Sequence, residues 1–107
     1  MTYTANHFGH FYLTYLLFDG VKKASEGRII NVSSGIHYSS KNDFLEDMTY
    51  EKNWNNLDAY ANSKMFNVLF TVGLNNLFKI KNIENIKTAS LHPGIVATNF
   101  GNGFCLF

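Results

Sequence analysis

Tyr60 and Lys64 have the residue types and the spacing that acid–base chemistry needs. They are four positions apart in an apolar-periodic segment, so on a helix they share one face. At about 5 Å and an effective dielectric constant near 20, an ammonium stabilises a neighbouring phenolate by roughly 3 kcal/mol. Such a tyrosine could act as an acid or a base near neutral pH. The same spacing also occurs in ordinary helix-surface pairs, so the pair alone leaves both interpretations open.

Two further polar residues lie where a reacting group could be held. Ser34 directly follows a short apolar run, and its hydroxyl could donate a hydrogen bond to a carbonyl or alcohol oxygen. A serine in Ser-Ser-Gly also commonly forms a turn. Asn6 stands near the start of the first apolar segment, where an asparagine is usually a helix cap or a surface amide.

Histidine and cysteine offer weaker candidates. His7 and His10 are three apart and would share a helical face, but no carboxylate or cysteine partner lies near them in sequence, so we assign no metal site. Cys105 has no adjacent base. The sequence also contains no nucleophilic triad signature and no glycine-rich phosphate loop.

Hydrophobic periodicity predicts the elements that position these residues. Apolar residues at helical spacing predict two helices, and short apolar runs bounded by glycine or proline predict two strands. In chain order we expect a helix over Thr4–Ala24, a buried strand over Arg28–Ser33, a polar loop over 35–57, a helix over Asp58–Phe78 and a strand over Ile86–Leu91.

Caps and apolar faces follow from the same pattern. Thr4 or Asn6 could cap the first helix and Asp58 the second, and a helical turn near Asp43 to Asp47 could interrupt the loop. A loop of this length in a compact domain is usually functional. The helical pattern runs through residues 8, 11, 12, 15, 16 and 21 in the first helix and residues 60, 61, 64, 65, 68, 69, 72, 74 and 77 in the second.

The order helix, strand, loop, helix, strand indicates an α/β fold with a parallel sheet. Two strands are too few for such a sheet, which is normally covered on both faces. The pattern therefore indicates part of a larger, doubly wound, Rossmann-like domain.

Composition excludes several classes of protein. The chain has 107 residues, is 46% hydrophobic and carries a net charge of +1, so neither disorder nor nucleic-acid binding is expected. A single cysteine excludes an internal disulfide. The N-terminus has no secretory pattern and no apolar run is long enough to span a membrane. We expect a location in the cytoplasm or on the cytoplasmic face of a membrane.

Four motifs in order resemble the short-chain dehydrogenase/reductases. They are NHFGHF (residues 6–11), GRIINVSS (27–34), YANSK (60–64) and HPGIVAT (92–98). The NHxGHF helix, the long serine-to-tyrosine loop and YxxSKxxNVLF resemble the branch of retinol dehydrogenases and WW-domain oxidoreductases. The resemblance covers about residues 3–100 and implies hydride exchange between NAD(P) and an alcohol or carbonyl. NADP is slightly favoured over NAD, and the substrate is expected to be a small lipophilic molecule, retinoid- or steroid-like.

The resemblance also implies roles for single residues. Tyr60 would move the proton at the substrate oxygen, and Lys64 would assist it and bind the nicotinamide ribose. Ser34 would position the substrate oxygen, with Ser33 facing away, and Asn6 would hold a water that relays protons to Lys64. The segment around the nicotinamide would comprise Pro93, Gly94, Val96 and Thr98.

The resemblance covers the central and catalytic part of one NAD(P)-binding domain. The family's TGxxxGxG segment has no counterpart in residues 1–107, nor has the end of its fold, so we expect this chain to be a fragment and inactive alone. The alternative is a non-catalytic remnant that acts through protein contacts, binding a related subunit. The resemblance separately implies a homodimer through the two helices. A nucleotide-sugar epimerase also uses YxxxK, but NHxGHF and HPGxVxT argue against it.

Overall fold

A computed structural model describes residues 2–41, 45–46, 48–49 and 55–94. The π-helical turn η1 (Thr4–Phe8) leads directly into α1 (Gly9–Lys22), and strand β1 (Gly27–Val32) follows. The 3₁₀ turn η2 (Gly35–Ser39), helix α2 (Asn56–Ile80) and strand β2 (Ile86–Leu91) complete the order. This is the expected helix, strand, loop, helix, strand sequence.

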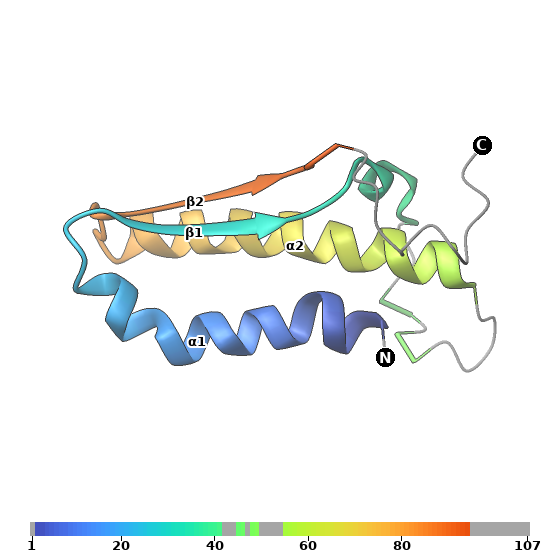
Figure 1. Ribbon diagram of the computed structural model, residues 1–107, viewed down its shortest axis with the longest axis horizontal. Coiled ribbons are helices and arrows are strands. Elements are labelled where there is room, and N and C mark those ends of the chain that lie inside the picture. The colour runs from blue at the N-terminus through green and yellow to red at the C-terminus, as the bar shows by residue number, and fades with distance from the viewer. Residues whose placement is uncertain (1, 42–44, 47, 50–54, 95–107) are drawn as a thin grey trace.

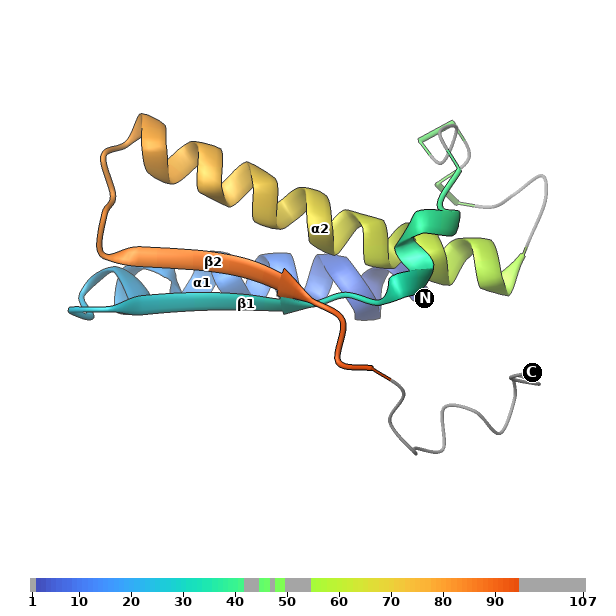
Figure 2. The same ribbon diagram turned by 90° about the horizontal axis from the view of Figure 1, so that it is seen from above.

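The two strands pair in parallel, with Gly27 opposite Ile86 and Val32 opposite Leu91. Because α2 crosses between them, the sheet forms part of a Rossmann-like α/β fold. Both helices lie on one face of the sheet, as Figure 1 and Figure 2 show from two directions. Burial in β1 accordingly alternates, and Ile30 and Val32 are 56% and 48% exposed. The expectation of a strand buried on both faces is wrong for the described residues, because helices cover only one face.

The apolar core lies beside the starts of the two strands. Ile29, Leu74, Phe78 and Ile86 form its buried centre. The ring of Phe18 on α1 stacks on Phe78 at a centroid distance of 6.0 Å, which joins α1 to the core. The core therefore occupies the half of the molecule opposite the carboxyl ends of the strands.

Close packing fixes the entry to β1. A Cβ atom at Gly27 would lie 2.9 Å from the carbonyl oxygen of Val21, so the turn after α1 requires glycine there. The Asn85 side chain closes the same turn by donating hydrogen bonds to the carbonyls of Lys22 and Ala24, at 2.9 and 2.8 Å. It thereby satisfies carbonyls that the end of α1 leaves without helical partners.

Helix boundaries differ from expectation at both starts. Thr4 and Asn6 lie inside a continuous helical segment and no side chain caps it, so their assignment as caps is wrong. The cap of α2 is Asn55, whose Oδ1 accepts from the backbone N–H groups of Leu57 and Asp58. An Asn side chain three residues earlier thus does what was expected of Asp58. Most of the expected turn near Asp43 to Asp47 lies outside the described residues.

The apolar faces also differ from expectation. No residue of α1 is buried, and Tyr12, Tyr15 and Leu16 are 58–71% exposed. In α2 the apolar residues Leu69, Val72 and Leu77 are exposed, whereas polar side chains in its first half are buried. The reason is that α2 meets η1 and β1 through hydrogen bonds there and meets the apolar core from Phe70 onward.

Candidate active site at the carboxyl ends of the strands

The carboxyl ends of β1 and β2 meet the first half of α2, η1 and η2. Figure 1 shows both strand arrows pointing toward η2 and the start of α2. Ser33 extends the sheet by one step, donating its backbone N–H to Leu91 O at 2.8 Å. In open parallel sheets, ligands bind at this edge.

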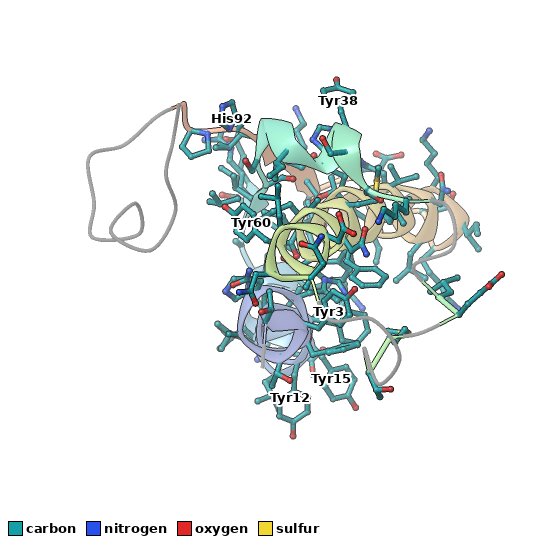
Figure 3. All side chains as sticks on the ribbon, turned by 90° about the vertical axis from the view of Figure 1, so that its right-hand side faces the viewer. Tyr3, Tyr12, Tyr15, Tyr38, Tyr60 and His92 are labelled. Atoms are coloured by element: carbon teal, nitrogen blue, oxygen red, sulfur yellow. The ribbon has the colours of Figure 1, made fainter. Side chains whose placement is uncertain are left out.

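Tyr60 and Lys64 occupy adjacent turns of α2 at this edge. The Lys64 ammonium lies 5.5 Å from the centre of the Tyr60 ring, so the pair expected from the sequence is in contact. Lys64 Nζ also donates to the carbonyl of Val32, the last residue of β1, at 3.3 Å. Burial lowers the pKa of Lys64 from its ordinary value of 10.5. Figure 3 shows Tyr60 and His92 on the same side of α2.

The two serines after β1 have different surroundings. Ser33 is buried, and its hydroxyl donates to the Lys64 carbonyl at 2.8 Å, which ties the end of β1 to the turn that carries the lysine. Ser34 is only partly buried and caps η2, with its hydroxyl accepting weakly from Ile36 N at 3.4 Å. Ser34 O accepts from His37 Nδ1 at 2.6 Å, which requires the proton on that nitrogen. Of the two serine hydroxyls, that of Ser34 is therefore the better placed to donate a hydrogen bond to a bound molecule.

Asn6 lies in the π-helical turn η1 and reaches α2 rather than solvent. Its side-chain amide donates to Ser63 Oγ at 3.0 Å, and Ser63 Oγ donates to the Tyr60 carbonyl at 2.7 Å. π-Helical turns are rare and frequently occur at functional sites. The contact brings Asn6 to the α2 turn between Tyr60 and Lys64.

His92, Pro93 and Gly94 follow β2 at the same edge and are exposed. Gly94 has φ +80°, in the left-handed region that favours glycine. Val96 and Thr98 lie outside the described residues.

The buried polar residues of α2 were not anticipated from the sequence. Ser63 and Asn67 are the largest fully buried side chains of the described part. A signal was available: residues 63, 67 and 71 are polar at a spacing of four, which puts them on one face of a helix. His7, considered above only as a metal ligand, is buried and pairs through Nδ1 with Asn67 Oδ1 at 3.0 Å. Among the described residues no three histidines, cysteines or carboxylates cluster for a metal.

The parallel sheet carries a Tyr–Lys pair, a serine and an asparagine at its carboxyl edge, which is the arrangement that the resemblance to the short-chain dehydrogenases implies. A model of the family described as short chain dehydrogenase matches residues 1–104, and the chain belongs to this family. The family binds NAD(P). Within the described residues, no helix is long and apolar enough to cross a membrane.

Several retinol dehydrogenases are similar to this chain. Human retinol dehydrogenase 12 is 42% identical over 91 residues, which are 85% of this chain and 28% of the relative. Mouse retinol dehydrogenase 14 is 39% identical over 101 residues, 94% of this chain and 29% of the relative. A crystal structure of an uncharacterised protein from Mycobacterium paratuberculosis superposes with a TM-score of 0.72 at 32% identity, covering 91% of this chain and 34% of that one. The chain thus spans under a third of the length of these two retinol dehydrogenases and about a third of the mycobacterial protein.

Proposed function

We propose that this chain is the central, catalytic part of an NAD(P)-dependent oxidoreductase that exchanges a hydride with an alcohol or carbonyl substrate. The observation that carries the proposal is the Lys64 ammonium 5.5 Å from the centre of the Tyr60 ring, at the ligand-binding edge of a parallel sheet. Membership of the short-chain dehydrogenase family supports it.

Each site residue has a task in this reaction. Tyr60 transfers the proton at the substrate oxygen, and the nearby Lys64 ammonium stabilises its phenolate form. The Ser34 hydroxyl donates a hydrogen bond to the same oxygen and so orients it. Asn6 supports a water that relays protons to Lys64. When bound, the nicotinamide supplies or accepts the hydride, and the protein provides position and proton transfer.

The residues at the edge fit a nicotinamide cofactor. Lys64 offers hydrogen-bond donors to the ribose, and its Nζ lies at the carboxyl end of β1, where it donates to the Val32 carbonyl. We assign the cofactor contacts to Tyr60, Lys64, Pro93, Gly94, Val96 and Thr98. NADP is slightly favoured over NAD by resemblance to the family, and comparing turnover with the two nucleotides tests this preference.

The substrate class follows from the named relatives. The names of human retinol dehydrogenase 12 and mouse retinol dehydrogenase 14 support a retinoid-like alcohol or carbonyl. The steroid-like alternative rests on the resemblance of the motifs alone. All-trans-retinol with NADP, and retinal with NADPH, are therefore the first substrates to assay.

The decisive experiment uses two proteins. The first is the product of the native transcript, read in full upstream of Met1 and downstream of Phe107. The second is a chimera in which the matched segment of human retinol dehydrogenase 12 is replaced by this chain's residues. We expect NAD(P)-dependent turnover that Tyr60→Phe lowers by about 10²- to 10⁴-fold, because the phenylalanine ring cannot transfer a proton. Tyr38→Phe is the matched control, since Tyr38 lies on η2 and is 86% exposed.

The outcomes separate the two candidate functions. An inactive native product with an active chimera would favour the second candidate, a non-catalytic remnant that acts through protein contacts. The exposed apolar face of α1 supports that candidate. Inactivity of both proteins, or turnover that survives Tyr60→Phe, would contradict the catalytic proposal itself.

We also propose a homodimer formed through the two helices. Phe11 and Tyr15 of α1 line a groove with Phe70 and Leu74 of α2, and the neighbouring Leu16 is 58% exposed. A second copy would cover these apolar side chains, which monomers rarely expose over a large area. Leu16→Glu should then convert dimers to monomers in sedimentation velocity, whereas Tyr38→Glu should not. A monomeric parent protein would contradict the dimer.

A further inference from the structure

Asn67 is a buried polar residue of this site to which the mechanism above assigns no role. It lies on α2 three residues after Lys64 and is 1% exposed. Its side-chain amide donates to two carbonyls, Asn6 O at 2.9 Å and Val32 O at 3.2 Å. Its oxygen faces His7 Nδ1 at 3.0 Å. One side chain therefore joins α2 to both η1 and β1.

These contacts fix the orientation of the amide. Exchanging its nitrogen and oxygen would place an oxygen against two carbonyl oxygens, which cannot donate. With the oxygen toward His7, the histidine must carry its proton on Nδ1. The His7 ring is itself held by stacking on Phe66 at 5.2 Å and 28°. The amide is thus held on both its donor and its acceptor side.

Each of the two carbonyls is linked to a residue of the proposed reaction, Lys64 or Asn6. The Val32 carbonyl also accepts from Lys64 Nζ, so the amide and the ammonium share one acceptor. The Asn6 carbonyl belongs to the residue whose side chain reaches Ser63. Because one amide binds both carbonyls, it sets the distance between η1 and the end of β1. Lys64 Nζ is bonded to that end of β1, so the same amide sets its distance from η1.

We propose that Asn67 is a positioning residue for the Asn6–Lys64 pair, acting through the carbonyls of Asn6 and Val32. The inference rests on the proposed function, because positioning has a kinetic consequence only in a protein that turns over. It assigns no contact with substrate or cofactor to Asn67.

The test compares three variants of the active protein, which is the native product or, if that is inactive, the chimera. Asn67→Leu keeps the volume and removes every hydrogen bond of the side chain. Asn67→Asp keeps an acceptor for His7 but presents oxygen to both carbonyls. Thr71→Val is the matched control, because Thr71 is also buried on α2 and hydrogen-bonded to β1, through Asn31 at 2.8 Å. Urea denaturation and circular dichroism give the folded fraction to which kcat is normalised.

Asn67→Leu should lower kcat by about 10- to 100-fold with less than about a threefold change in either KM, because misplacement of a reacting group acts on the chemical step. Thr71→Val should lower stability by a similar amount but leave kcat within about twofold. In Asn67→Asp a protonated carboxyl can donate one hydrogen bond to a carbonyl, so kcat relative to the parent should recover as the pH falls from 9 to about 6. His7 from η1 and Lys64 from α2 are the titratable groups that face this position.

Equal kcat and pH profiles for Asn67→Leu and its parent would overturn the inference while the proposed function stands. A loss that Thr71→Val matches would overturn it also, because the role would then be structural. If Asn67→Leu does not fold, the pH dependence of Asn67→Asp decides between the outcomes. A ratio of its kcat to that of the parent that stays constant with pH overturns the inference. A parent that is inactive in both forms contradicts the proposed function and this inference with it.

Discussion

Replacing Ser63 by alanine tests whether Asn6 is held in place by the helix that carries Tyr60 and Lys64. Ser63 has no exposed surface, accepts from Asn6 Nδ2 at 3.0 Å and donates to the Tyr60 carbonyl at 2.7 Å. Alanine removes both hydrogen bonds and creates almost no cavity. The side chain of Asn6 then loses its hydrogen bond to Ser63, which directs it toward the site.

The expected magnitude follows from these two contacts. A net hydrogen bond contributes about 0.5–1.5 kcal/mol, and an amide left buried without a partner costs more than one that reaches water. Asn6 is partly exposed, so its amide can recover water, and the Tyr60 carbonyl keeps its helical partner. We therefore expect Ser63→Ala to lower the free energy of unfolding by about 1–2 kcal/mol, of which about 1 kcal/mol belongs to the contact with Asn6.

A double-mutant cycle measures that share directly. The variants are made in the active protein, which is the native product or the chimera. Urea denaturation of Asn6→Ala, Ser63→Ala and the double variant should give a coupling energy of about 1 kcal/mol, because both single variants break the same hydrogen bond. Asn85→Ala is the control: it removes two hydrogen bonds at the far end of α1 and should add to Asn6→Ala within about 0.5 kcal/mol. Ser63→Ala should also lower kcat by about tenfold, and Asn85→Ala should leave kcat unchanged.

Additive effects of Asn6→Ala and Ser63→Ala would refute this reasoning. The hydrogen bond between the two side chains would then contribute nothing in solution, and Asn6 would be free to turn. A coupling energy with no change in kcat would keep the contact but remove its role in catalysis.

Three further predictions concern charge, core and exposed surface. Lys64→Met should abolish turnover yet raise the melting temperature at pH 7. Burial lowers the pKa of Lys64, so burying its charged form destabilises the fold fully below the folded-state pKa and less and less toward pH 10.5. The difference between the melting temperatures of the two proteins should therefore close near pH 10.5. Phe78→Ala should cost about 3–5 kcal/mol in urea denaturation, because Phe78 is 4% exposed in the core, with kcat per folded molecule unchanged. The isolated 107 residues should lack a cooperative thermal transition by calorimetry, because Ile30 and Val32 leave one sheet face open; a sharp transition would contradict this.

The elements themselves were predictable because they depend on local pattern. Strand β2 has the expected bounds of Ile86–Leu91. Strand β1 (Gly27–Val32) begins and ends one residue earlier than the expected Arg28–Ser33. Both strands are short apolar runs with glycine or proline at their ends, which local pattern detects well. Tyr60 and Lys64 were found for the same reason, since a spacing of four is itself local.

The buried polar contacts were not predictable, because their partners are far apart in sequence. Asn6 and Ser63 are separated by 57 positions, and His7 and Asn67 by 60. Periodicity locates apolar residues, and it assigned the buried face of α2 to side chains such as Leu69 and Val72 that are about half exposed. A polar side chain becomes buried only where a partner meets it, and the sequence does not state which residues meet.

The two halves of α2 are stabilised by different interactions. Its second half buries Leu74 and Phe78 against the sheet, which gives non-directional apolar burial. Its first half is held by hydrogen bonds of Ser63 and Asn67 to η1 and β1, which depend on direction and distance. Apolar contacts tolerate small shifts, whereas these bonds do not, so the site is built where geometry is most tightly specified. Substitutions in the second half should therefore change stability more than kcat, and those in the first half kcat more than stability.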